Sequence, residues 1–185
     1  MQRKANKDIN PIFLERWSPR AFSDEPVTQE EILTILEAAR WSPSCYNEQP
    51  WRFAVAQSDE KKQAFVETLV KPNQAWAGEA SALIYIVYKK TYMQTGNPNE
   101  WAFFDAGASW MAMALQAHMM GISMHAMAGF KQQKAAELLG LSDDYVVAAA
   151  AAVGRKGDKS RLPEQIQAME EPSGRMAVED LLIDF

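Results

Sequence analysis

Two arginines four residues apart frame the most informative stretch of the chain, at residues 16–22, which reads Arg-Trp-Ser-Pro-Arg-Ala-Phe. Arg16 and Arg20 supply planar, permanently charged guanidinium groups, and Ser18 supplies a small hydroxyl between them. A phosphate monoester accepts forked, charge-assisted hydrogen bonds from such groups. The Ser18-Pro19 pair allows the bend, or the single helical turn, that would bring both guanidinium groups to one anion.

A second interpretation of the same stretch is a solvated basic turn between two helices. Composition alone favours this second interpretation, because two arginines within seven residues are common. The whole chain has 19 basic and 24 acidic residues and a net charge of −5, which argues against nucleic acid or an anionic membrane as its main partner. Any anion site must therefore be a local basic pocket.

Length and composition are those of a folded protein. With 185 residues, 48% hydrophobic and 23% charged, we expect a single domain over residues 1–185 with a core that needs neither disulfide nor metal. Cys45 is the only cysteine, which fits a reducing compartment, and His118 and His125 lack the spacing of a zinc site. With no signal-peptide pattern and no apolar run of membrane-spanning length, the sequence predicts a soluble cytoplasmic protein.

Helices and strands alternate along the chain and must position these groups. Thr28, with Glu31 three residues later, forms a capping-box pattern that predicts a helix over residues 29–40. The run at residues 82–88 is apolar on both faces, which is typical of a strand at the centre of a sheet. The pattern predicts an α+β domain with three layers. Further strands are expected at 51–57, 122–127 and 145–153, and further helices at 8–15, 59–69 with an interruption at Pro72, 101–120 and 132–139.

The segment 101–120 is the longest expected helix and is rich in alanine and methionine. A helix that is apolar nearly all round is buried, either in the core of one chain or between subunits. Its methionines are interpreted as adaptable packing rather than as ligands. Gly121 is expected to end the helix as a C-terminal cap.

Four motifs in register, from near residue 10 to near residue 165, resemble one known family. They are residues 16–22, Ser-Pro-Ser-Cys-Tyr-Asn-Glu-Gln-Pro-Trp-Arg-Phe at 42–53, Met-Ala-Gly-Phe at 127–130, and Lys-Ser-Arg-Leu-Pro at 159–163. Together they resemble the nitroreductase family of FMN-dependent oxidoreductases. The resemblance implies a three-layer α+β fold in which a mostly antiparallel sheet is flanked by helices. It also implies an intertwined homodimer with two FMN molecules at the subunit interface.

At the phosphate end of FMN, the resemblance assigns residues from both ends of the chain. The first motif of the family binds the FMN phosphate and ribityl chain, and the last motif closes over the same phosphate. Because cationic side chains from both motifs would surround one dianion, the resemblance favours the phosphate site over the solvated turn. The implied ligands are Arg16, Trp17, Ser18 and Arg20 from the first motif and Lys159 and Arg161 from the last.

The second motif is implied to reach across the dimer to the flavin of the partner. Pro43, Ser44 and Cys45 should touch the isoalloxazine ring, and Asn47 and Gln49 follow the same pattern. For Asn47, a turn held by side-chain to backbone hydrogen bonds is an equally favoured interpretation. Gln49 is expected to serve structure more than ligand binding.

The third motif is implied to contact the flavin ring from within the same chain. Met127, Ala128 and Gly129 resemble the family turn whose backbone N–H meets the nitrogen that carries hydride, and glycine suits such a close approach. Asn73 resembles a family asparagine that hydrogen-bonds the pyrimidine edge of the ring. Trp76 departs from the family pattern, since some members carry a lysine there.

The implied activity is a ping-pong hydride transfer from NAD(P)H, as co-substrate, to a nitroaromatic, a quinone or a similar small acceptor. The redox chemistry belongs to the cofactor, so no side chain is required as acid or base. Two alternatives remain open. One is a flavin-binding or redox-sensing protein without turnover, and the other is an association domain whose arginines are only surface charges.

Overall fold

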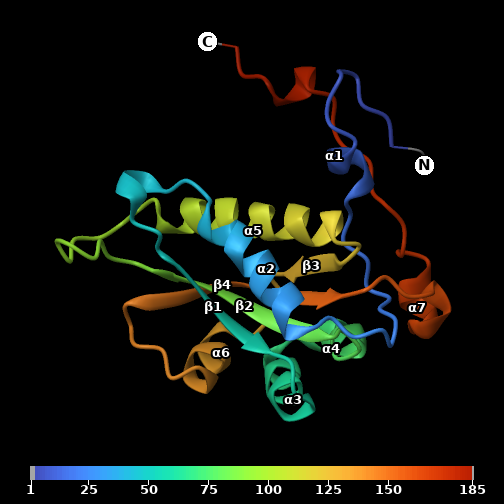
Figure 1. The fold of residues 1–185 in the computed structure, drawn as a ribbon, viewed down its shortest axis with the longest axis horizontal. Coiled ribbons are helices and arrows are strands. Elements are labelled where there is room, and N and C mark those ends of the chain that lie inside the picture. The colour runs from blue at the N-terminus through green and yellow to red at the C-terminus, as the bar shows by residue number, and fades with distance from the viewer. Residues whose placement is uncertain (1–2, 185) are drawn as a thin grey trace.

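The computed structural model describes residues 3–184 and is built around a four-stranded sheet (Figure 1). The strands are β1 (Trp51–Ala56), β2 (Ala82–Lys89), β3 (Ser123–Met127) and β4 (Tyr145–Gly154). Their order is β1-β2-β4-β3, and each neighbouring pair is antiparallel. The mostly antiparallel sheet expected from the sequence is therefore confirmed.

Helices cover both faces of the sheet and make three layers (Figure 1). One face carries α2 (Gln29–Arg40) and α5 (Ala102–Met119), and the other carries α3 (Asp59–Thr68), α4 (Lys71–Ala77) and α6 (Gln132–Leu138). Shorter helices are α1 (Ile12–Glu15) and α7 (Glu164–Gln167), and 3-10 turns span Cys45–Asn47, Lys159–Arg161 and Glu179–Leu181.

Strand β2 is buried on both faces, as its apolar run predicts. Leu83 and Tyr85 join the core cluster that includes Phe65 of α3, whereas Ile84 packs on the opposite face with Ile35 of α2. Successive side chains of a strand point to opposite faces, so a central strand between two helical layers needs apolar residues at every position.

The capping box at the start of α2 is formed as predicted. The Thr28 hydroxyl accepts a hydrogen bond from the Glu31 amide at 3.2 Å, and the Glu31 carboxylate accepts one from the Thr28 amide at 2.8 Å. Helix α2 then buries Ile32, Ile35 and Ala39 against the sheet. The helix starts where it does because two otherwise unsatisfied backbone amides gain side-chain acceptors.

Two prolines account for the main differences from the predicted helices. Helix α1 covers only the second half of the segment 8–15, because Pro11 excludes its preceding residue from helical geometry and the Asn10 side chain caps the Ile12 amide. Pro72 does not simply interrupt a helix. It lies in the first turn of α4, where a missing backbone N–H costs nothing, and so helix α4 was missed.

Helix α5 has one face against the sheet and one face exposed. Its small residues, among them Ala106, Ser109 and Ala117, are buried, whereas Phe104 is 73% exposed and Met119 is 64% exposed. Of the two expected ways to bury this helix, burial all round in the core of one chain is therefore excluded. Burial of the other face between subunits stays a prediction.

Within residues 3–184, no helix is both long and apolar enough to cross a bilayer. The same part of the chain contains no group of three or more histidine, cysteine or acidic side chains arranged to hold a metal ion.

Candidate functional site

The first and last motifs of the sequence lie side by side in the fold. Phe22 forms an antiparallel bridge with Lys156, and the Gly157 amide donates to the Ala21 carbonyl at 2.8 Å. A Cβ atom on Gly157 would lie 2.5 Å from the backbone of Phe22, so only glycine allows this approach. Backbone contacts thus join the segment that follows β4 to the first motif, next to the predicted phosphate site.

Arg16 is a half-buried cation in this site and has no acidic partner among residues 3–184. Its Nη1 atom lies 3.4 Å from the hydroxyl of Ser18, which brings two predicted ligands together. Burial lowers the pKa of Arg16, and the nearby charges of Arg3 and Arg175 lower it further. A positive charge that is desolvated and repelled by its neighbours would be stabilised by a bound anion.

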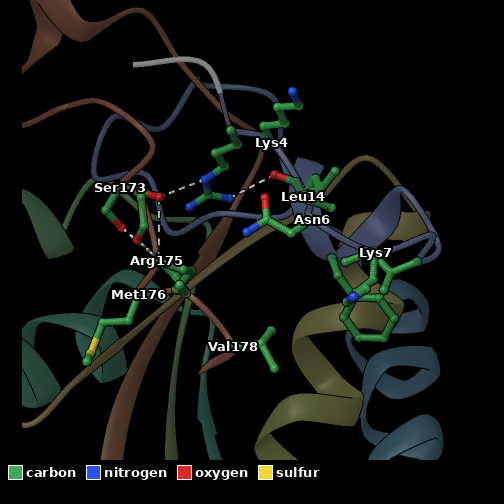
Figure 2. A pocket seen from close by; sticks show the side chains of 14 residues that line it. Lys4, Asn6, Lys7, Leu14, Ser173, Arg175, Met176 and Val178 are labelled. Atoms are coloured by element: carbon green, nitrogen blue, oxygen red, sulfur yellow. Dashed lines mark hydrogen bonds between the residues drawn. The ribbon is translucent and has the colours of Figure 1, made fainter. Parts of the chain in front are cut away.

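The charged neighbours of Arg16, Arg3 and Arg175, lie in the two terminal segments of the chain. These segments, residues 3–14 and 173–178, enclose a cavity of about 510 Å³ (Figure 2). Arg3 ties the segments together, donating to the carbonyl oxygens of Ser173 and Leu14, each at 2.9 Å. Arg3 and Arg175 line the cavity together with two lysines, and among residues 3–184 no acidic residue lines it. Sequence patterns did not point to these two arginines, because they lie outside the motifs and far from each other along the chain.

The other predicted cations of the phosphate site already have partners or lie exposed. Arg161 makes a two-pronged ion pair with Asp24, at 2.9 and 2.5 Å, which raises the pKa of Arg161 and lowers that of Asp24. Lys159 is exposed, and Arg20 lies 3.7 Å from a carboxylate oxygen of Glu170. A role of Arg20, Lys159 and Arg161 at a phosphate stays a prediction.

Trp17 contributes an aromatic face to the same region. The ammonium group of Lys156 lies 5.3 Å from the centre of its ring, within the range of a cation–π contact. Lys156 is exposed and belongs to the segment that bridges Phe22. The segment around Lys156 therefore contributes a lysine that the four motifs do not include.

Two residues predicted to contact the flavin ring, Asn73 and Gly129, touch each other. The Asn73 Nδ2 atom donates to the Gly129 carbonyl at 3.0 Å, and the Val70 amide donates to the same oxygen at 3.0 Å. A Cβ atom on Gly129 would lie 2.6 Å from Asn73 Nδ2, so the contact requires glycine. Ala128 is exposed beside them, whereas the side chain of Met127 is buried in the core and packs there.

The predicted cross-dimer segment forms a tight turn at 43–49. The Ser44 hydroxyl accepts from the Gln49 amide at 3.0 Å, and Gln49 Nε2 donates to the Asn47 carbonyl at 2.9 Å. Asn47 adopts a left-handed backbone conformation with φ of 57°, which asparagine tolerates better than most residues. Gln49 thus helps to hold the turn. Pro43 is exposed at the start of the turn.

Cys45 lies in this turn and is linked to the start of α5. Its amide donates to the buried carboxylate of Asp105 at 3.1 Å, and its thiol lies 3.6 Å from the Tyr92 hydroxyl. This hydrogen bond with Cys45 raises the pKa of Tyr92 to about 12, so the phenol stays protonated at neutral pH. The contacts fix the turn against α5, next to the exposed face of that helix.

Trp76 is a core residue, only 2% exposed, at the position where some family members carry lysine. Its ring packs against Phe22 and, at 4.7 Å between centres, against His125. The His125 Nδ1 atom lies 3.1 Å from the Pro19 carbonyl, and because a carbonyl only accepts, Nδ1 carries the proton. Where some family members have a charged lysine, this chain thus has the apolar ring of Trp76, which packs beneath the loop 16–22.

Comparisons with known proteins agree with this geometry. The family model described as Nitroreductase family matches residues 14–71 and 61–155. A protein of Archaeoglobus fulgidus, provisionally named NADH dehydrogenase/NAD(P)H nitroreductase, is 30% identical over 156 residues, which cover 80% of this chain and 85% of the relative.

Solved structures show the same fold. A structure described as an oxidoreductase containing FMN has a TM-score of 0.93 and 39% identity, with 98% of this chain and 94% of that chain covered. A nitroreductase family protein from Streptococcus pneumoniae TIGR4 has a TM-score of 0.78 and 19% identity, with 94% and 98% covered. The family model and the Archaeoglobus relative each span most of the chain, and the protein belongs to the Nitroreductase family.

Proposed function

We propose that this protein is an FMN-dependent oxidoreductase that transfers hydride from NAD(P)H to a small acceptor such as a nitroaromatic compound or a quinone. The observation that carries the proposal is the half-buried charge of Arg16, which has no acidic partner in the described part of the chain. It lies in a loop packed against the opposite end of the chain. The solved relative that is 39% identical, and described as containing FMN, supports the choice of ligand.

The side chains present fit the phosphate of FMN. Arg16 and Arg20 would bind the phosphate oxygens, Ser18 would donate its hydroxyl, and Trp17 would lie along the ribityl chain. Forked, charge-assisted hydrogen bonds from two guanidinium groups match a phosphate dianion in geometry and charge. Lys159 would add a further charge, whereas Arg161 would have to leave Asp24 in order to contribute.

The contact between Asn73 and Gly129 fits the flavin ring. Two hydrogen bonds to the Gly129 carbonyl hold its peptide in place, so the neighbouring exposed backbone is fixed before any ligand arrives. FMN, when bound, supplies the hydride acceptor and donor, and the chain supplies binding, orientation and electrostatics. No side chain of the site is assigned as acid or base.

The site is proposed to be completed by a second copy of the chain. Pro43, Ser44 and Cys45 would then face the flavin of the partner. They lie in a turn bonded to the start of α5, and Tyr46 of the same turn is 91% exposed. Such an exposed aromatic residue beside an uncovered helix face is typical of a subunit interface. The lone thiol of Cys45 fits a reducing compartment, and we propose the cytoplasm.

The absorption spectrum of the purified full-length protein tests the proposal. We expect the bands of oxidised flavin, and consumption of NADH or NADPH when a nitroaromatic compound or a quinone is added. Flavin binding without NAD(P)H oxidation would instead indicate a flavin-binding or redox-sensing protein. A colourless protein that does not take up added FMN would contradict the proposal entirely.

A further inference from the structure

A buried carboxylate from the carboxyl-terminal tail, residues 164–184, holds the backbone of the arginine loop, residues 16–22. The side chain of Glu170 is 3% exposed, although it lies about 150 residues away from the loop along the chain. Its Oε1 atom accepts hydrogen bonds from the amides of Arg20, at 2.7 Å, and Ala21, at 2.9 Å. Two backbone donors that would otherwise be buried and unsatisfied are thus paired by one side-chain oxygen.

The second carboxylate oxygen of Glu170 has a different surrounding. Within residues 3–184, Oε2 is buried and has no hydrogen-bond partner, and the nearest cation is Arg20, whose Nη1 atom lies 3.7 Å away. Arg20 Nη1 also donates to the Met169 carbonyl at 3.4 Å. A buried carboxylate is costly unless it is paired, and here two backbone amides and the guanidinium group of Arg20 offset that cost.

The loop is held from three sides. His125 of β3 donates to the Pro19 carbonyl, the Gly157 amide donates to the Ala21 carbonyl, and Glu170 accepts from the amides between them. Because these backbone groups are satisfied by distant parts of the chain, the loop has one preferred conformation before any anion binds. Such preorganisation lowers the cost of binding.

We propose that Glu170 is a positioning residue for the FMN phosphate. Its Oε1 atom fixes the peptides on either side of Arg20, and its Oε2 atom keeps the guanidinium group of Arg20 beside the loop. This inference rests on the proposed function. It makes the tail part of the cofactor site, through a residue that lies outside the four motifs.

The test compares FMN with riboflavin, which has the same ring and ribityl chain but no phosphate. Full-length protein freed of flavin is titrated with each compound, and binding is followed by flavin fluorescence. Glu170→Ala and Glu170→Met both remove the acceptor, and the methionine variant also refills the buried volume. Glu170→Gln keeps one acceptor oxygen, and Glu171→Ala changes the exposed neighbour as a control.

We expect Glu170→Ala and Glu170→Met to weaken FMN binding about tenfold or more and to leave riboflavin binding within about twofold of wild type. Glu170→Gln and Glu171→Ala should keep the wild-type preference for FMN over riboflavin. Equal losses for both flavins, unchanged FMN affinity in the acceptor-free variants, or failure of both to fold would overturn the inference. If the wild-type protein binds neither flavin, the proposed function itself fails.

Discussion

The charge of Arg16 has two effects that experiments can separate, because it is unfavourable without a bound anion and favourable with one. Burial and the charges of Arg3 and Arg175 lower its pKa. We predict that Arg16→Gln weakens FMN binding by about 1.5–3 kcal/mol, the range for a hydrogen bond to a charged group. The flavin-free protein should keep or gain thermal stability, because a repulsion is removed. Flavin titration and thermal unfolding measure the two effects.

Lys7 provides the matched control for Arg16. It lines the terminal cavity but is exposed and outside the four motifs. Lys7→Gln removes the same charge and should leave FMN affinity within about twofold, since exposed charges are strongly screened by water and salt. Equal FMN affinity in wild type and Arg16→Gln would remove Arg16 from the phosphate site.

His125 should make the stability of the protein depend on pH. Burial lowers its pKa in the folded state, whereas the unfolded chain titrates near the ordinary value of about 6.5. Between these two values the unfolded chain binds more protons, so stability is fully present above about pH 6.5 and is lost as pH falls through this window. We predict that His125→Asn, which keeps a donor for the Pro19 carbonyl, reduces this loss. Melting temperatures from pH 5 to 8 provide the measurement, and superimposable profiles for the two proteins would refute the assignment.

Among the secondary structure elements, those with local signals were predicted well. The capping box set the start of α2, and the two-sided apolar run identified β2 as central. Helix α4 was missed because proline is the residue type that most often ends a helix. Only the folded backbone shows that Pro72 lies in the first turn of a helix. Local sequence patterns predict only local geometry. A proline is favourable in the first turn of a helix but ends a helix elsewhere, and the sequence alone does not distinguish the two cases.

The candidate site likewise has one part that the sequence predicts and another part that it does not. Arg16 and Ser18 are two residues apart and could be paired from the sequence, whereas the contacts of Arg3, Arg175 and Glu170 depend on where the tail folds. The tail has neither an amphipathic period nor a family motif, so no property of its sequence points to the arginine loop. The pairing of Arg161 with Asp24 was hidden because the two residues are 137 positions apart along the chain.

The cap of α2 gives a prediction at the level of an element. Thr28→Ala removes the acceptor for the Glu31 amide and should lower the free energy of unfolding by about 1 kcal/mol. Thr34→Ala, on the exposed face of the same helix, should be neutral or stabilising because alanine has the higher helix propensity. Urea denaturation measures the free energy of unfolding of the two variants. Equal losses of stability would mean that the cap makes no specific contribution.

At the scale of the whole molecule, the large apolar side chains left exposed lie mainly around α5 and along the two terminal segments. Monomeric proteins rarely expose a large continuous apolar surface, so this arrangement calls for a partner. The two terminal segments lie close together beyond this side of the sheet (Figure 1). The predicted cross-dimer turn at 43–49 is bonded to the same helix through Cys45 and Asp105. Around α5 these exposed residues are Trp41 and Tyr46 next to the helix, and Trp101, Phe103, Phe104, Met111 and Met119 on or beside it; along the terminal segments they include Ile9, Phe13, Met176, Val178, Leu181, Leu182 and Ile183.

Dimer formation and flavin binding should therefore fail together. We predict that Phe104→Glu, which places a charge on the exposed face of α5, shifts the protein from dimer to monomer at micromolar concentration and releases FMN. Leu33→Glu, which changes a half-exposed apolar residue of α2, should keep both the dimer and its FMN. Light scattering gives the mass and the absorption spectrum gives the bound flavin. A wild-type mass of one chain with FMN bound, or a monomeric Phe104→Glu that still retains FMN, would show that one chain suffices to hold the cofactor.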